Sequence, residues 1–282
     1  MRALLLAIAL MTTPAIAQVP NVMTDIAPVQ SLAALVMGDL GTPGQLLDPA
    51  ADPHNVQLRP SQASALSRAD LVISMGDALT PWLTDTAATL APEAVPLLLL
   101  DLPGLTQIIE TDAPDPHAWL DPLNAAQYLP AIAAALSDLD PANAPTYRTN
   151  ADAAVQQLQA LDAEVRQTLA PMRDAPLIAY HDAYRYFLNR YDLRQVGFVT
   201  DTAGTAPGVA SIGALRDALA ATTAPCIMVE PGTRPALIDS LGLTDAKIVE
   251  IDALGLTLTP GPDLYATMIR KAAETLATCA KP

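Results

Sequence analysis

The chain contains only three histidines, and each of them lies in the same kind of place. His54 and His117 stand in polar segments just before predicted helices, and His181 directly follows a predicted strand. In a parallel sheet such loops meet at the carboxyl ends of the strands, where ligands bind. A single loop histidine is more often a solvated or capping residue than a ligand, so the hypothesis of a metal site depends on all three together.

A fourth candidate ligand is Asp252, which follows the predicted strand at 248–251. The histidines are too widely spaced along the sequence to match any short zinc motif. The sequence also lacks a His-Glu-x-x-His motif, a Gly-x-Ser-x-Gly motif and a glycine-rich phosphate loop, so it offers no enzyme signature.

Short apolar runs alternate with helical patterns along the whole chain, which is typical of βαβ units and parallel sheets. The predicted strands are Asn21–Ile26, Asp70–Ser74, Val95–Leu100, Leu177–Tyr180, Gln195–Val199, Cys226–Val229 and Ile248–Ile251. The predicted helices are Pro28–Asp39, Pro60–Arg68, Pro122–Leu136, Ala144–Leu169, Asp182–Tyr191, Val209–Ala221, Arg234–Leu241 and Asp263–Ala280.

One predicted helix is unusually long, because apolar residues recur at helical spacing through most of the segment 141–172. It is either one more crossover helix in a single α/β domain or a rigid strut between two similar α/β lobes. Its length and its mid-chain position favour the strut. The predicted organisation is an α/β protein with an N-terminal lobe at 18–140, a linking helix at 141–173 and a C-terminal lobe at 174–282.

The first residues have the pattern of a secretory signal peptide. A positive residue, Arg2, is followed by an apolar run and then by the small-residue site Ala15-Ile16-Ala17. The apolar run is too short to span a bilayer, and no cysteine follows it that could take a lipid. We therefore expect cleavage after Ala17 and release of the free product into an oxidising compartment, with an uncleaved anchor as the alternative.

In an oxidising compartment the two cysteines, Cys226 and Cys279, are expected to form a disulfide. A redox or metal-binding pair is the alternative, although such pairs normally have closer spacing.

The composition excludes several classes of protein. With 51% apolar and 16% charged residues, the chain is too hydrophobic to be a disordered polymer. Its net charge of −15 argues against partners such as nucleic acid or an anionic membrane surface, and is compatible with a cationic ligand.

Several segments resemble the zinc-specific periplasmic solute-binding proteins of ABC importers, a class that also contains manganese-binding relatives. The resemblance covers essentially the whole chain after the signal segment. The segments that carry it are the His54 loop with Leu58-Arg59-Pro60-Ser61, Asp115-Pro116-His117-x-Trp119-Leu120-Asp121-Pro122, His181-Asp182-Ala183-Tyr184-x-Tyr186-Phe187, and Cys226-Ile227-Met228-Val229-Glu230-Pro231 with Arg234-Pro235-Ala236.

This resemblance implies a metal site made of His54, His117, His181 and Asp252, between two lobes joined by one long helix with little hinge movement. It also implies a monomer that is not inserted in the membrane. This monomer captures Zn²⁺ as cargo and delivers it to the membrane permease of an ABC importer, without enzymatic activity. A zinc hydrolase would keep a coordination position open for water, whereas Asp252 closes the set.

The donor set favours zinc, because three imidazoles and one carboxylate suit tetrahedral Zn²⁺, while manganese prefers more oxygen ligands. The manganese relatives have a carboxylate in place of the third histidine, here His181. Manganese or another divalent metal remains an alternative cargo, and an adhesin on the same scaffold or a zinc hydrolase are alternative functions. The segment 102–114 contains no histidine, unlike the His-rich loop of many zinc members.

Around the site, Asp121 and Asp182 could accept hydrogen bonds from the imidazole N–H groups, with helix capping as an equal alternative. Glu230 follows a predicted strand and is expected to form a turn or a polar contact between the lobes, with an approach to the metal as the alternative. Trp119 is expected to pack beside the site. Zinc affinity is expected to fall steeply below about pH 6, near the pKa of free histidine.

Overall fold

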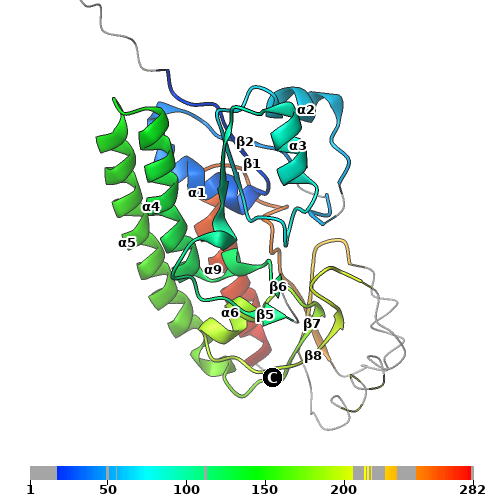
Figure 1. Ribbon diagram of the computed structural model, residues 1–282. Helices are drawn as coiled ribbons and strands as arrows, with labels where there is room; N and C mark the ends of the chain where they lie inside the picture. The colour runs from blue at the N-terminus through cyan, green and yellow to red at the C-terminus, as the bar shows by residue number, and fades with distance from the viewer. Residues whose placement is uncertain are drawn as a thin grey trace, which may run out of the picture.

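The computed structural model describes residues 18–205, 226–233 and 246–280, except 49, 50, 55, 111 and 112, together with 213, 215 and 217. The predicted signal segment and the predicted helix at 234–241 lie outside these residues, and so does most of the predicted helix at 209–221. The described residues form two lobes, each built on a four-stranded parallel sheet. The lobes lie one above the other beside a pair of long helices (Figure 1).

The sheet of the N-terminal lobe has the strand order β2-β1-β3-β4, and all its pairs are parallel. Successive side chains of each strand point to opposite faces of the sheet, and those of the buried strands are mostly apolar on both faces, as expected for a sheet covered on two sides. Leu71 and Ile73 pack on the face covered by α1, whereas Val72 packs on the opposite face against α2 and α3. The elements are β1 (Val22–Thr24), β2 (Gly44–Gln45), β3 (Leu71–Ser74), β4 (Val95–Leu98), α1 (Ala27–Met37), α2 (Pro60–Leu66) and α3 (Leu83–Leu90).

The sheet of the C-terminal lobe has the strand order β10-β9-β7-β8 and is also parallel throughout. A short antiparallel hairpin of β5 and β6 lies where the two lobes meet (Figure 1). The elements are β5 (Ile109–Glu110), β6 (Ala113–Pro114), β7 (Leu177–His181), β8 (Gln195–Thr200), β9 (Cys226–Val229), β10 (Lys247–Glu250), α4 (Pro122–Leu139), α6 (Arg185–Arg190) and α9 (Leu264–Ala277).

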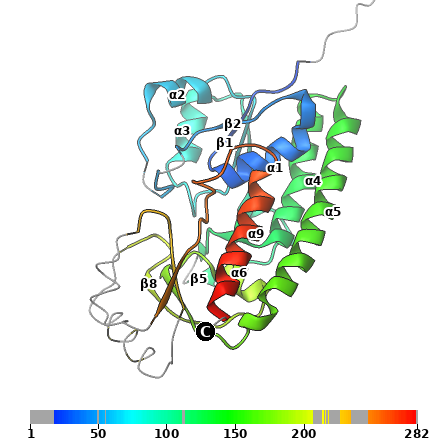
Figure 2. The ribbon, with the colours of Figure 1, turned by 180° about the vertical axis from the view of Figure 1, so that it is seen from behind.

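The helix α5 (Ala144–Leu169) joins the two lobes and has 26 residues, about 39 Å of length at the rise of an α-helix. It runs beside α4 and α9 over the height of the molecule (Figures 1 and 2). Near its start, Asn150 donates to the carbonyl of Val36 at the end of α1, over 3.0 Å. Near its end, Arg166 donates to the carbonyl of Arg190 at the end of α6, over 2.7 Å. The predicted long linking helix is therefore confirmed, and it is tied to both lobes.

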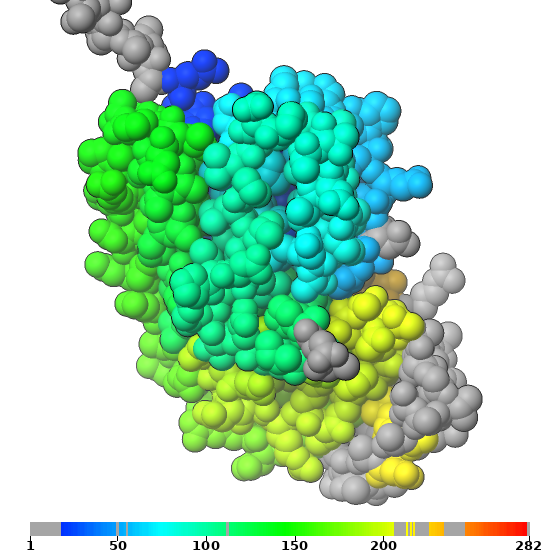
Figure 3. Space-filling view, in the orientation of Figure 1, coloured from blue at the N-terminus to red at the C-terminus, as the bar shows by residue number. Residues whose placement is uncertain are grey.

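The two lobes are also in direct contact, as the cyan and yellow-green parts of the surface in Figure 3 show. The C-terminal segment contributes to this packing, because the backbone N–H of Tyr265 donates to the hydroxyl of Ser31 in α1, and that hydroxyl donates to the carbonyl of Pro262, both over 3.0 Å. The predicted α/β class with two parallel-sheet lobes is confirmed, while the exact lobe boundaries stay a prediction.

Every predicted strand is present, but β2, the β5–β6 hairpin and α3 were not predicted. The three strands are two residues long each, too short to carry an alternating pattern. The sequence of α3, LTDTAATL, has only two large apolar residues, Leu83 and Leu90, and no side chain caps its start. In the described part of the chain, no helix has both the length and the apolarity needed to cross a bilayer.

A disulfide joins Cys226 and Cys279, as predicted, and closes a chain separation of 53 residues. It connects the start of β9 to the segment after α9, so it fixes the last helix to the C-terminal sheet. We expect the Cys226→Ser/Cys279→Ser variant to lose about 4 kcal/mol of unfolding free energy, since cross-linking restricts the unfolded chain. Urea unfolding followed by circular dichroism measures this loss, with reduced wild-type protein as the matched control. Equal urea midpoints for the oxidised wild type and the variant would contradict the expectation.

Candidate functional site

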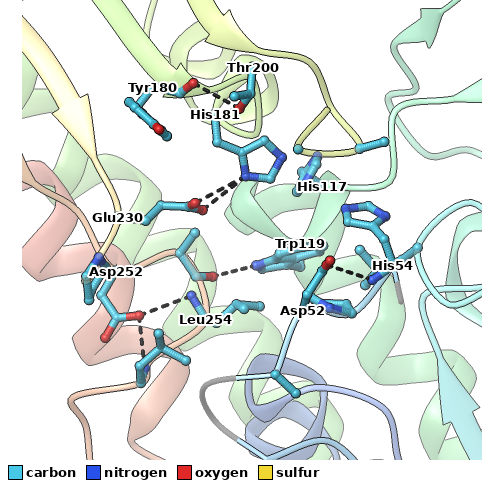
Figure 4. A pocket seen from close by; sticks show the side chains of 18 residues that line it. Asp52, His54, His117, Trp119, Tyr180, His181, Thr200, Glu230, Asp252 and Leu254 are labelled. Atoms are coloured by element: carbon cyan, nitrogen blue, oxygen red, sulfur yellow. Dashed lines mark hydrogen bonds and ion pairs between the residues drawn. The ribbon is translucent and has the colours of Figure 1, made fainter. Parts of the chain in front are cut away.

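The three histidines meet where the two lobes face each other. One side-chain nitrogen from each of His54, His117 and His181 lies within 4.8 Å of the other two. The ring centroid of His117 is 5.0 Å from that of His181 and 6.0 Å from that of His54. The three rings face one another in Figure 4. The cluster predicted from the sequence is therefore assembled by the fold.

The C-terminal lobe supplies its part of the site from one edge of its sheet. His181 is the last residue of β7, Glu230 follows β9 and Asp252 lies just after β10. Because these strands are parallel neighbours, their carboxyl ends lie at the same edge. The N-terminal lobe supplies His54 from the segment before α2 and His117 from the segment before α4.

Buried aromatic side chains hold the site segments of the two lobes together. The indole N–H of Trp119 donates to the carbonyl of Ala253 over 2.9 Å, so the loop before α4 is bonded to the loop after β10. The hydroxyl of Tyr186 donates to the carbonyl of Asp115 over 3.0 Å, which bonds α6 to the segment before His117. Trp119 and Tyr186 are almost fully buried, so these bonds are shielded from water. The site is thus held across both lobes, and Trp119 packs beside it as predicted.

His117 is oriented by a buried carboxylate. Asp115 Oδ1 lies 2.9 Å from His117 Nδ1 and accepts the His117 backbone N–H over 2.9 Å. Both residues are buried, with relative exposures of 1% for Asp115 and 2% for His117. A carboxylate at Nδ1 fixes the proton there and leaves the lone pair on Nε2.

His54 is held through its backbone, because Asp52 Oδ1 accepts its N–H over 3.0 Å and the indole N–H of Trp82 donates to the carbonyl of Pro53 over 3.0 Å. Burial lowers the pKa of His54, and the neighbouring His117 lowers it further. A lowered pKa keeps this imidazole neutral, which is the form that binds metals.

His181 has an acceptor at each ring nitrogen. Glu230 places its two carboxylate oxygens 3.2 and 3.3 Å from Nδ1, and the carbonyl of Thr202 lies 3.2 Å from Nε2. Burial lowers the pKa of His181, but the hydrogen bond and charge of Glu230 together with the Thr202 carbonyl outweigh it, so the pKa is raised overall. A proton on His181 therefore competes with a metal ion for this ring.

Asp252 lines the same pocket but does not join the group of three histidines. Its carboxylate accepts the backbone N–H groups of Leu254, Leu256 and Thr257 over 2.9–3.3 Å, and the Thr257 hydroxyl over 3.0 Å. These four bonds use the acceptor positions of both oxygens. To bind a metal, Asp252 has to release at least one of them, and its role as a ligand stays a prediction.

The acceptors behind the imidazoles differ from those expected. Asp121 caps α4 by accepting the Leu123 N–H over 2.8 Å and pairs with Arg190, and Asp182 pairs with Arg185. Neither aspartate accepts a hydrogen bond from an imidazole. The alternative, helix capping, is confirmed for Asp121, whereas the oxygens of Asp182 accept from Arg185 and Gln195. Asp115 and Glu230 take this place instead. A sequence signal exists only for Asp115, which stands two residues before His117. Glu230 follows β9, and the sheet order, which the sequence does not show, places this strand beside that of His181.

The pocket around the histidines has a volume of about 460 Å³ and combines ligand side chains with acidic ones. Its wall includes the three histidines, Glu230 and Asp252. Three imidazole nitrogens within 4.8 Å of one another can share a cation, and the carboxylates offset its charge.

Comparison with known proteins agrees with this geometry. A family model described as zinc-uptake complex component A, periplasmic, matches residues 22–279. The high-affinity zinc uptake system protein ZnuA of Paracoccus denitrificans is 37% identical, over 98% of this chain and 97% of its own. The protein of the same name from Brucella abortus is 31% identical, over 92% of this chain and 91% of its own. A crystal structure of ZnuA, 23% identical, superposes with a TM-score of 0.82 over 94% of this chain and 100% of its own. With a matched family that spans almost its whole length, this chain belongs to the periplasmic A components of zinc-uptake complexes.

Proposed function

We propose that this protein captures Zn²⁺ in the periplasm and delivers it to the membrane permease of an ABC importer. The observation that carries the proposal is the convergence of one nitrogen from each of His54, His117 and His181 within 4.8 Å of one another. Relatives with at least 31% identity over most of the chain are named as high-affinity zinc uptake proteins, which supports zinc as the cargo.

The ligands that we propose are the three histidines and Asp252. Three neutral nitrogens and one carboxylate oxygen suit Zn²⁺, whereas Mn²⁺ prefers sites richer in oxygen. With four protein ligands the site has no open position for a catalytic water, so binding rather than hydrolysis is the activity. Cu²⁺ and Ni²⁺ are expected to bind in vitro, because they have high affinity for imidazole sites.

The family is periplasmic, and we propose that this chain reaches that compartment by cleavage of its signal segment after Ala17. The oxidising conditions there allow the disulfide that the structure contains. We further propose that the mature protein acts as a monomer, since each chain carries a complete set of ligands.

Metal analysis of protein purified from the periplasm tests the proposed function. We expect one zinc per chain, and we expect a deletion strain to stop growing under zinc chelation and to recover when zinc is added. Purification without zinc, together with unimpaired zinc uptake in a strain that lacks every other zinc importer, would contradict the proposal.

The proposed ligand role of Asp252 has its own test. We expect Asp252→Ala to weaken zinc binding at least about tenfold and to change the visible absorption of the Co²⁺-loaded protein, since the side-chain oxygen donor is lost. Thr257→Val is the matched control, because it removes one hydrogen bond of the same carboxylate and keeps the oxygen donor. An unchanged Co²⁺ spectrum in Asp252→Ala would show that Asp252 is not a ligand and only stabilises its turn.

A further inference from the structure

Glu230 has no place in the ligand set above, yet its carboxylate faces the site. It follows β9, and both its oxygens lie 3.2–3.3 Å from Nδ1 of His181 (Figure 4). Among the residues that the structure describes, His181 is the only side chain with which this carboxylate forms a hydrogen bond or an ion pair. Any effect of the Glu230 carboxylate on the site therefore acts through His181.

The position of Glu230 decides which nitrogen of His181 is free to bind a metal. A carboxylate at Nδ1 holds the ring proton on that atom, so the lone pair is on Nε2. Asp115 imposes the same arrangement on His117, where Oδ1 lies 2.9 Å from Nδ1. Two of the three imidazoles are thus backed by a carboxylate, one from each lobe.

The second contact of His181 cannot hold the ring once a metal is bound. The Thr202 carbonyl lies 3.2 Å from Nε2, the atom that has to coordinate the metal, so this contact is replaced on binding. The Glu230 contact lies on the opposite side of the ring and is kept. Glu230 is consequently the group that fixes the orientation of His181 in the loaded site.

The two carboxylates also differ in their surroundings. The side chain of Asp115 is fully buried, whereas that of Glu230 keeps 31% of its surface exposed. Each carboxylate places negative charge at the Nδ1 of an imidazole. Negative charge at Nδ1 makes Nε2 a stronger donor to a divalent cation. Without Asp115, the buried imidazole of His117 would have no partner at Nδ1. Without Glu230, water can reach Nδ1 of His181, because this side chain is 14% exposed.

We propose that Glu230 is a positioning residue that presents Nε2 of His181 to the metal and raises the affinity of the site for zinc. This inference rests on the proposed function and deepens it, because it names a determinant of zinc affinity outside the ligands.

The test is the variant Glu230→Gln, which keeps the size of the side chain and removes its charge. We expect zinc affinity, measured by competition with a chelator at pH 8, to fall by roughly 10–100-fold. The Co²⁺ absorption bands are expected to stay where they are in the wild type, because the donor atoms do not change. Nitrogen-15 shifts of His181 are expected to show the Nδ1–H tautomer in the wild type and a mixture of tautomers in the variant.

Glu250→Gln is the matched control. Glu250 is exposed at the end of β10, the strand beside β9, so the control removes an equal charge from the same sheet and leaves His181 untouched. Equal zinc affinity of Glu230→Gln and wild type, or an equal loss in Glu250→Gln, would overturn the inference. Shifted Co²⁺ bands would also overturn it, by showing that Glu230 is a ligand. A wild-type protein that binds no zinc would refute the proposed function itself. The wild-type measurement therefore separates failure of the proposed function from failure of this inference.

Discussion

The variant His117→Ala is expected to lose tight zinc binding, with affinity reduced roughly 10²–10³-fold. Zinc sites with four protein ligands have binding free energies of about 10–16 kcal/mol, so one of the four ligands accounts for about 2.5–4 kcal/mol. The ring centroid of His117 is 5.0 Å from that of His181 and 6.0 Å from that of His54, so the three rings surround one point. Its buried ring is also preoriented by Asp115, so no entropy is spent on ordering it when the metal binds. Chelator competition with purified, metal-free protein measures the loss.

A second variant separates loss of a zinc ligand from loss of folding stability. His117→Ala leaves the buried Asp115 without its imidazole partner, which lowers stability as well as affinity. His54→Ala removes another proposed ligand from a more exposed segment, and we expect a comparable loss of affinity with little change in melting temperature. Tyr180→Phe, which alters the wall of the pocket and no ligand, is the control that keeps zinc. Zinc affinity equal to that of the wild type in both alanine variants would refute the three-histidine site.

The sequence is sufficient to predict the main elements and the three histidines, because both depend on local patterns. The 26 residues of α5 carry buried positions such as Leu158, Leu161 and Val165 at helical spacing. His181 ends a run of apolar residues, which is where a parallel strand presents a ligand. Neither inference needs knowledge of the other lobe.

Side-chain directions, by contrast, depend on contacts that the sequence does not show. Asp252 follows its strand as predicted, but the geometry of the turn up to Thr257 directs its carboxylate to backbone N–H groups. Asp121 follows the pattern of a helix cap, yet its pairing with Arg190 joins residues that are far apart in the chain. For Glu230, the partner is on another strand, and only the sheet order β9-β7 brings it to His181. Partners of this kind follow from tertiary packing and not from spacing.

Zinc affinity is expected to begin falling at a pH above 6.5, the ordinary pKa of histidine. Zinc binds only neutral imidazole, so a proton on any of the three rings competes with it. Burial lowers the pKa of His181, but Glu230, the Thr202 carbonyl and the charge of Asp182 together outweigh this effect, so the pKa is raised above 6.5. The pKa of His54 is lowered, chiefly by burial, so this ring competes only in more acidic solution. On lowering the pH, His181 takes up its proton first and His54 later, and affinity falls about tenfold per pH unit for each ring that must lose a proton.

Chelator competition between pH 8 and pH 5.5, with the chelator corrected for its own protonation, measures this profile. The variant Glu230→Gln supplies the control, since its His181 loses the partner that raises the pKa and is expected to start competing at a lower pH. Glu230 stabilises His181 both when this ring is protonated and when it binds a metal. It therefore raises zinc affinity most at a pH where the metal-free His181 is neutral. The affinities of wild type and variant are therefore expected to differ most at pH 8 and to converge as the pH falls. A wild-type affinity that stays constant down to pH 5.5 would mean that the imidazoles do not hold the metal, and parallel profiles for the two proteins would mean that Glu230 does not govern the proton on His181.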